Sequence, residues 1–207
     1  ARAQISQLPP VNEVYVPIMQ LSGIVSEAKA KAWAEKVQAI IPATARETAQ
    51  SPVIDGVQEG LWSGAGVYKI GNVIYSPASS EADFSASYRA MWDAKNLYVL
   101  VNVTDDVLKN DSDEFYLDDA VEVFIDADNS KSADYGDNDY QYFFEWAEAN
   151  PRMGESRHSR AEGVEFAVGR ADAGYRVEIE FPWAGLGVKP SAGTKIGQDI
   201  HVNDDDD

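Results

Sequence analysis

Alternation of apolar and polar residues is the clearest pattern in this chain, and it is typical of β-strands. Between residues 84 and 92 apolar side chains fall at every second position, and residues 97–103 repeat this period after a turn at residues 93–96. Because successive side chains of a strand point to opposite faces, these two runs predict a β-hairpin. Similar short runs predict strands at residues 120–125, 140–146, 164–170, 175–181 and 196–202.

The first 52 residues follow a different pattern. Between residues 26 and 41 the apolar positions, among them Trp33, Val37 and Ile40, fall at helical spacing before Pro42, which predicts one amphipathic α-helix. Residues 14–21 are consistent with a short strand or an extended arm, and residues 43–52 with a linker. The sequence therefore predicts an all-β domain over residues 53–207, an antiparallel β-sandwich or jelly roll. A short N-terminal extension with one α-helix, residues 1–52, precedes it.

Composition limits the classes of protein to which the chain can belong. Its 207 residues are 44% hydrophobic, enough for one substantial core, and no apolar run approaches the roughly 18 residues of a membrane-spanning helix. The first residues also lack the apolar centre of a signal peptide, so the chain as given reads as soluble. With no cysteine, disulfides and thiolate metal sites are excluded.

The charge is strongly negative and unevenly distributed. The chain carries 17 basic and 35 acidic residues, a net charge of −18, which disfavours binding to nucleic acid or insertion into an anionic membrane. Residues 1–50 hold only five of the basic and four of the acidic residues. Between residues 104 and 139 there are thirteen carboxylates against two lysines. So dense a cluster favours relief by cations or solvent.

The segment from residue 126 to residue 139 is rich in the hard oxygen donors that calcium prefers. Calcium takes about six to eight such ligands. An EF-hand is excluded, because Lys131 stands where its loop needs glycine and Asp137 where it needs glutamate. The alternative is a polar loop with diffuse counterions. We expect structural calcium here, with candidate ligands Asp126, Asp128, Asn129, Asp137 and Asp139.

An aromatic residue and a carboxylate near the centre of the chain suggest sugar binding. Tyr116 and Glu122 are six residues apart, so both can approach one end or face of the sheet. A sugar ring packs its C–H face on an aromatic ring, and its hydroxyls donate to carboxylates. Spacing alone favours the alternative, an ordinary loop aromatic and a solvated strand residue. Trp146, beside the acidic loop, is a further candidate, whereas the other tryptophans are expected in the core.

Catalysis is poorly supported. The chain has two histidines and no cysteine, which leaves little material for a nucleophile with its base. Pairs of carboxylates can hydrolyse glycosides, but such pairs arise by chance in so acidic a protein. The candidates would be Glu122, Glu145, Glu178 and Glu180. We therefore expect a binding module and not an enzyme.

Five stretches together resemble family 9 carbohydrate-binding modules, and they occur in the family's order. They are VIDG at residues 53–56 with Trp62, AMWDAKNLYVLV at 90–101, DDAVEVFID at 118–126, GYRVE at 174–178 with PW at 182–183, and VND at 202–204. The resemblance runs from Val53 to Asp204. It implies a jelly-roll sandwich with bound calcium, secreted by a bacterium and attached to a xylanase or a related enzyme that degrades plant polysaccharides.

The resemblance also implies roles for single residues. Tyr116 falls at the first tryptophan of the family's sugar-binding pair, and Glu122 falls on its sugar-binding glutamate. Two positions depart from the family: Phe143 stands where an arginine would contact the sugar, and Glu145 replaces a nearby polar residue. The family's second tryptophan would follow Asp207. We therefore expect a module truncated at its C-terminus, the alternative being that the N-terminal segment covers the exposed sheet edge.

Together these observations predict non-catalytic binding of xylan- or cellulose-type sugars at chain ends. The module would hold an attached glycoside hydrolase at the polysaccharide surface and raise its local concentration there. Its partners would be polysaccharide or small sugars and other domains of the same extracellular protein. The alternative is a calcium-stabilised sandwich used for extracellular assembly or surface attachment, with a degraded sugar site. The departures at Phe143 and Glu145 favour that alternative.

Overall fold

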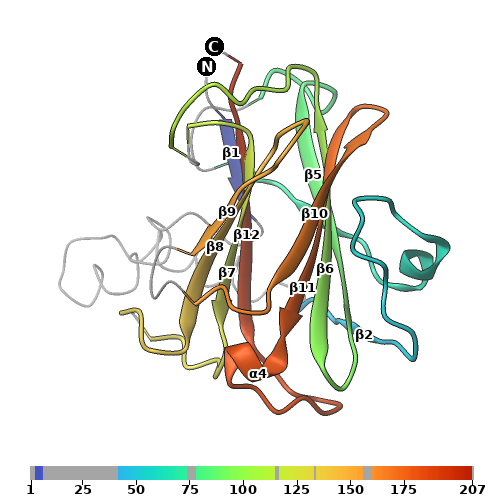
Figure 1. The fold of residues 1–207 in the computed structure, drawn as a ribbon. Coiled ribbons are helices and arrows are strands. Elements are labelled where there is room, and N and C mark those ends of the chain that lie inside the picture. Colours follow the sequence, from blue (N-terminus) through green and yellow to red (C-terminus); the bar gives the residue numbers. More distant parts are fainter. Residues whose placement is uncertain are drawn as a thin grey trace, which may run out of the picture.

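A computed structural model shows two packed β-sheets with both ends of the chain at the same pole (Figure 1). It describes residues 3–6, 42–73, 78–114, 117–132, 134–155 and 160–206. The predicted arm at residues 14–21 and the predicted helix at residues 26–41 lie outside the described residues. The predicted β-sandwich is confirmed.

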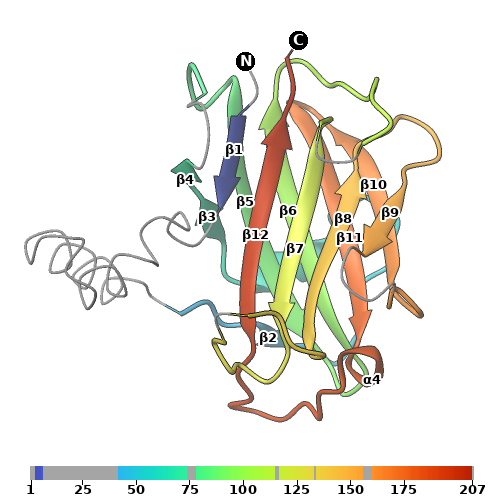
Figure 2. The same ribbon diagram turned by 90° about the vertical axis from the view of Figure 1, so that its left-hand side faces the viewer.

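Sheet A has six strands and is seen face-on in Figure 2. Their order across the sheet is β4 (Asn72–Val73), β1 (Ala3–Ser6), β12 (Gly197–Asp204), β7 (Ala120–Asp126), β8 (Asp139–Glu145) and β9 (Met153–Glu155). All pairs in this sheet are antiparallel. The register places residue 203 opposite Ala120 and Gly197 opposite Asp126, so β7 and β12 run side by side over nearly their whole length.

Sheet B packs against sheet A and contains the predicted hairpin. Its order is β10 (Glu165–Ala171), β11 (Gly174–Pro182), β6 (Asn96–Asp105), β5 (Phe84–Trp92) and β2 (Arg46–Glu47), and β3 (Tyr68–Ile70) also pairs with β5. The pair of β2 with β5 is parallel. A 3₁₀-helix, η1 (Gly60–Gly64), and a short α-helix, α4 (Trp183–Leu186), complete the described elements. No helix of this described part is long and apolar enough to span a membrane.

The strands predicted from alternation are present with bounds shifted by a few residues. Four short strands, β1 to β4, and β9 were not predicted, because runs of two to four residues are too short to show a period. Two of these come from the predicted N-terminal extension: β1 pairs with β12, and β2, inside the predicted linker, pairs with β5. The extension therefore contributes strands to both sheets.

The core lies between the sheets and is formed by one set of alternating side chains from each strand. In β7 the core residues are Val121, Val123 and Ile125, and β11 contributes Val177 and Ile179. Aromatic rings fill the space towards β8, where Tyr142 packs on Phe181 with 5.0 Å between ring centroids. The residues between these core positions point to the outer faces of the sheets. The outer face of sheet A is therefore formed by every second residue of its strands.

The outer face of sheet B is covered by the segment at residues 53–66. Trp62 of η1 is fully buried there against Met91, Tyr98 and Leu100, which form a second apolar cluster. Close approach is possible because two glycines meet: a Cβ atom on Gly169 would lie 2.2 Å from the carbonyl oxygen of residue 56. That face is therefore occupied by the chain itself.

The carboxylate of Glu178 fixes this covering segment. It projects outward from β11, is fully buried, and accepts hydrogen bonds from the Nε1 atom of Trp62 (2.9 Å) and from the backbone amides of Asp55 (3.2 Å) and Gly56 (2.9 Å). Burial raises the pKa of Glu178, while the same three donors lower it. Glu178 was one of the candidate carboxylates for glycoside hydrolysis, but its contacts give it a structural role.

Replacing Glu178 with alanine is expected to lower the free energy of unfolding by about 3 kcal/mol or more, because three buried donors lose their acceptor. Urea denaturation measures the change. Glu180→Ala is the matched control: Glu180 lies on the same strand, is partly exposed, and accepts one hydrogen bond from Asn96. A loss of stability no larger than that of Glu180→Ala would contradict the anchoring role.

Candidate functional site

A buried carboxylate lies on the outer face of sheet A, where no covering segment of the kind seen on sheet B is described. Glu122 projects outward from the middle of β7 and is 5% exposed. Its Oε1 accepts a hydrogen bond from Nδ2 of Asn203 on β12 (2.9 Å), and its Oε2 accepts one from Nε2 of Gln141 on β8 (3.2 Å). Three neighbouring strands therefore contribute to one hydrogen-bonded network.

Ring side chains flank this network on the same face. In the register of sheet A, Glu122 lies directly between Phe143 of β8 and His201 of β12. One row further along, Phe124 packs on the His201 imidazole with 4.6 Å between ring centroids, and Nε2 of His201 is 2.9 Å from Oδ2 of Asp199. The face thus combines half-buried rings with hydrogen-bonding groups, as a sugar requires.

Asn203 leaves one polar atom unused. Since a carboxylate only accepts hydrogen bonds, the amide must turn its Nδ2 atom towards Glu122, which directs Oδ1 elsewhere. That oxygen is buried and has no partner among the described residues. An unpaired buried acceptor costs about 1–3 kcal/mol, which a ligand hydroxyl can recover. Sequence reasoning missed the roles of Gln141 and Asn203, because only strand register brings them to Glu122.

The ligand-binding residues predicted from the sequence do not all lie in one place. Glu122 and Phe143 are adjacent on the outer face. Glu145 is buried on the same face, where its two oxygens accept hydrogen bonds from the Arg152 guanidinium, with 2.6 Å from Nε to Oε2. Trp146 is in the core, with its ring 5.5 Å from that of Tyr175.

Tyr116 lies outside the described residues. Its convergence with Glu122 on one hollow therefore stays a prediction.

The loop predicted to hold calcium lies at the far end of β7. The Oδ1 and Oδ2 atoms of Asp126 accept hydrogen bonds from the backbone amides of Ser130 (3.0 Å) and Lys131 (2.8 Å), and Oδ1 of Asp128 accepts one from Ser130 (2.9 Å). A hydrogen bond from Asn138 is the main cause that lowers the pKa of Asp128. The carboxylates of Asp126 and Asp128 thus accept hydrogen bonds from the backbone of the same loop. Calcium bound to Asp126, Asp128, Asn129, Asp137 and Asp139 stays a prediction.

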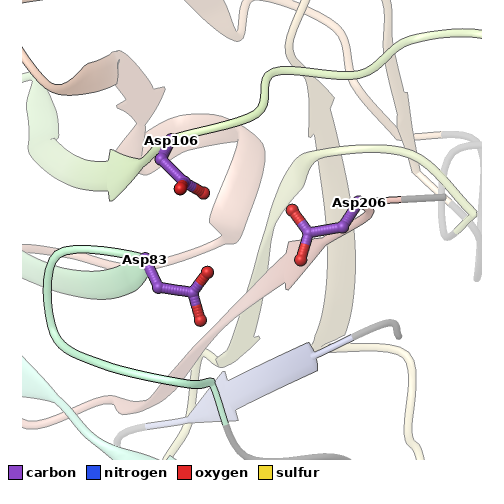
Figure 3. Close-up of side chains that lie close together, drawn as sticks. All are labelled: Asp83, Asp106 and Asp206. Carbon is purple, nitrogen blue, oxygen red and sulfur yellow. The ribbon is translucent and has the colours of Figure 1, made fainter.

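At the opposite end of the sandwich, nine aspartates converge in three groups of three. Within each group the carboxylate oxygens lie within 4.8 Å of one another. Each group contains one of the three residues 204–206. Residue 204 is the last residue of β12, and residues 205 and 206 follow it. Figure 3 shows one group, in which three carboxylates from separate parts of the chain point into a common space. The groups are Asp83, Asp106 and Asp206; Asp105, Asp119 and Asp204; and Asp111, Asp118 and Asp205.

The middle group is the buried one. Asp105 ends β6 of sheet B, whereas Asp119 precedes β7 and Asp204 ends β12 of sheet A, so the group joins the two sheets. All three are buried. Burial, followed by repulsion from the neighbouring carboxylate of Asp105, raises the pKa of Asp119 and of Asp204 to about 8. Burial likewise raises the pKa of Asp105 to about 6.

Two buried oxygen atoms at this end of the sandwich have unused capacity to bind a ligand or an ion. Oδ2 of Asp105 and the hydroxyl of Tyr175 are buried without a hydrogen-bond partner in the described part of the chain. Burial raises the pKa of Tyr175, and the carboxylates of Asp119, Asp105 and Asp204 raise it further. One carboxylate oxygen of each residue lies within 4.8 Å of the other two, so a single cation could contact all three.

The raised pKa values predict how the metal-depleted protein responds to pH. Asp119 and Asp204 hold protons in the folded state that they release in the unfolded state above about pH 4. The free energy of unfolding therefore falls as pH rises towards 8. We expect the melting temperature in metal-depleted buffer to decrease from pH 5.5 to pH 8 and Asp119→Asn to reduce the decrease. A melting temperature that rises from pH 5.5 to pH 8 would contradict the raised pKa values of Asp119 and Asp204.

A separate cavity of about 930 Å³ opens at the end of the sandwich away from the aspartates. It is lined by Tyr88 and Trp92 of β5, by Trp183, and by the loop that leads into β12, with Lys131 and Lys195 also present. Neither Glu122 nor its two amide partners belong to this lining. The outer-face network is therefore distinct from this cavity.

The fold and the outer-face site define a β-sandwich binding domain. A family profile described as "Carbohydrate family 9 binding domain-like" matches residues 54–207, about three quarters of the sequence. The chain belongs to this family of carbohydrate-binding modules, which confirms the resemblance seen in its sequence motifs. Membership also confirms the expectation of a non-catalytic module.

Curated relatives are enzymes of which this chain matches one part. It is 34% identical over 171 residues to endo-1,4-beta-xylanase A of Thermotoga neapolitana, covering 82% of this chain and 15% of the relative. It is 37% identical over 157 residues to endo-1,4-beta-xylanase A of Thermoanaerobacterium saccharolyticum, covering 76% and 13%. The chain thus spans about one seventh of the length of the relatives it matches.

Solved structures support the fold. A family 9 carbohydrate-binding module from Caldicellulosiruptor kristjanssonii in complex with cellotriose superposes with a TM-score of 0.64 at 24% identity, covering 78% of this chain and 83% of that one. The same module in complex with glucose gives a TM-score of 0.61 at 24% identity, covering 78% and 84%. The two-sheet arrangement is therefore that of a known family 9 module.

Proposed function

We propose that this chain binds sugars of plant polysaccharides, of the xylan or cellulose type, through the outer face of sheet A. The observation that carries the proposal is the buried carboxylate of Glu122, oriented by two amides and flanked by rings. Sugar hydroxyls donate to such a carboxylate, and the C–H face of a sugar ring packs on aromatic surface. The carbonyl oxygen of Asn203 adds a buried acceptor.

In its natural context the module would bring an attached glycoside hydrolase to its substrate. The matched relatives are xylanases, and each is several times longer than the matched region. A tethered enzyme acts on bound polysaccharide at a raised effective concentration without any new contact in its catalytic domain. A bacterial, extracellular or cell-surface location follows from such a substrate, because plant polysaccharides are too large to enter cells.

Isothermal titration with xylose, glucose and the matching xylo- and cello-oligosaccharides tests the sugar site. We expect dissociation constants between about 1 μM and 1 mM for at least one of them, since a shallow surface site buries little area. Glu122→Ala should weaken binding by about 10- to 100-fold, because it removes a charge-assisted acceptor.

Glu165→Ala is the matched control for this experiment. Glu165 is an exposed glutamate on β10 of sheet B, and its removal is expected to leave the dissociation constant unchanged. Circular dichroism verifies that both variants are folded. No heat with any sugar, in wild type and variants alike, would reject the sugar site. Equal affinity of wild type and Glu122→Ala would reject its position.

We also propose that a calcium ion is held between the two sheets by the buried group Asp105, Asp119 and Asp204. Oxygen-only donors suit calcium, and the ion would neutralise three carboxylates that burial otherwise forces to keep protons. The side chain of Asp119 is positioned by backbone amides of Lys109 (2.6 Å) and Asp205 (2.9 Å), so its orientation is set by the protein. The ion's role here is structural.

Chelation tests the proposed ion and its position. Removing calcium that was present at a hundredfold excess over its dissociation constant should cost about 2.7 kcal/mol and lower the melting temperature by about 5–10 °C. Asp105→Ala should abolish the difference that calcium makes, whereas Asp128→Ala, in the loop predicted from sequence, should retain it. The opposite result would place the calcium in that loop. An unchanged melting temperature after chelation would reject both positions.

A second candidate function is extracellular assembly or surface attachment by a sandwich whose sugar site is degraded. The ion pair of Glu145 with Arg152 favours it, because this carboxylate is engaged within the protein. Pull-down on insoluble xylan and cellulose distinguishes the two functions. Loss of binding in Tyr116→Ala with an unchanged melting temperature supports the sugar module. Absence of pull-down by the wild type supports assembly.

A further inference from the structure

The buried aspartate group and the Glu122 network are built on the same two strand ends. Asp119 directly precedes β7, and Glu122 lies on that strand three residues further on. Asp204 is the last residue of β12, and Asn203, which donates to Glu122, is the residue before it. On β12 a cation-facing side chain and a sugar-facing one therefore belong to adjacent residues.

The two sites face opposite sides of sheet A. Asn203 is directed outward to Glu122, while the next residue, Asp204, is directed inward to the buried group. The pairing of β12 with β7 ends at Asn203 opposite Ala120, so Asp204 and Asp119 lie just beyond the last paired residues. A displacement of Asp204 is thereby transmitted to the amide of Asn203.

The buried group connects these strand ends to the other sheet. Asp105 belongs to β6 of sheet B, and its Oδ2 atom is buried without a partner in the described residues. Carboxylates this close repel strongly in a medium of low dielectric constant. Without a cation the carboxylates either keep protons or move apart, and in this arrangement moving apart means lifting the ends of β7 and β12 away from β6.

We propose that a divalent cation bound by Asp105, Asp119 and Asp204 raises the affinity of the outer face for sugar. The cation draws the ends of β7 and β12 onto β6 and so holds the Asn203 amide at 2.9 Å from Glu122, in the arrangement that a sugar hydroxyl meets. The inference rests on the sugar and calcium binding proposed above and adds a coupling between them. By linkage, sugar then raises the affinity for the cation by the same factor.

Titration calorimetry with the preferred sugar, in saturating calcium and in metal-depleted buffer, tests the coupling. Circular dichroism at the temperature of the titration shows that both samples are folded. We expect the sugar dissociation constant to rise by about 5- to 150-fold when calcium is removed. The calcium dissociation constant, measured with and without sugar, should change by the same factor.

Two variants locate the coupling. Asp204→Asn should bind sugar as weakly as the metal-depleted wild type and show no response to calcium. Asp172→Asn removes the same charge from an exposed position in the turn between β10 and β11, and it should behave as wild type. If the metal-depleted wild type unfolds, Asp105→Asn replaces it as the cation-free form, because it removes one of the repelling charges.

The outcomes separate the coupling from the proposals on which it rests. An equal sugar dissociation constant with and without calcium, in a protein whose melting temperature calcium raises, overturns the coupling alone. No effect of calcium on the melting temperature overturns the cation site and the coupling but leaves sugar binding standing. No heat with any sugar in either buffer overturns the sugar site itself and the coupling with it.

Discussion

Repulsion among buried carboxylates is the constraint around which one end of this sandwich is organised. Asp105, Asp119 and Asp204 come from both sheets and meet where no solvent screens them. Burial of a charge without a partner costs several kcal/mol, so the arrangement is tolerable only if protons or a cation neutralise it. Closure of the sheets at this pole therefore depends on that neutralisation, and these carboxylates form part of the net charge of −18.

The two outer faces show how the same residue type can serve different purposes. Glu178 on sheet B is enclosed by an indole and two backbone amides, donors that the fold itself fixes. Glu122 on sheet A is held by two side-chain amides, and one of these keeps an unused acceptor. A carboxylate whose partners are all fixed by backbone and core is structural. One whose partners are side chains with spare capacity can exchange contacts with a ligand.

Features that depend on neighbouring residues in the sequence could be predicted, whereas features that depend on contacts between distant residues could not. Alternation is local, so the seven main strands and the sandwich could be predicted, and Glu122 was singled out through the motif at residues 118–126. Gln141 and Asn203 could not be assigned roles, because strand register alone brings them to Glu122. The density of acidic residues along the chain pointed to the loop at residues 126–139. The three clusters in the described residues join aspartates of the acidic stretch at residues 104–139 to Asp83 and to residues 204–206, a convergence that only the closed fold creates.

The contact between Gly56 and Gly169 has a consequence for anyone who wishes to redesign the module. Backbone meets backbone there, and the left-handed conformation of Gly56 adds a second reason why no larger residue fits. Mutational libraries aimed at the outer face of sheet B would first have to detach the segment that seals it. Variation for new sugar specificity is better directed at sheet A, where half-buried side chains on β7, β8 and β12 can be exchanged without opening a backbone seam.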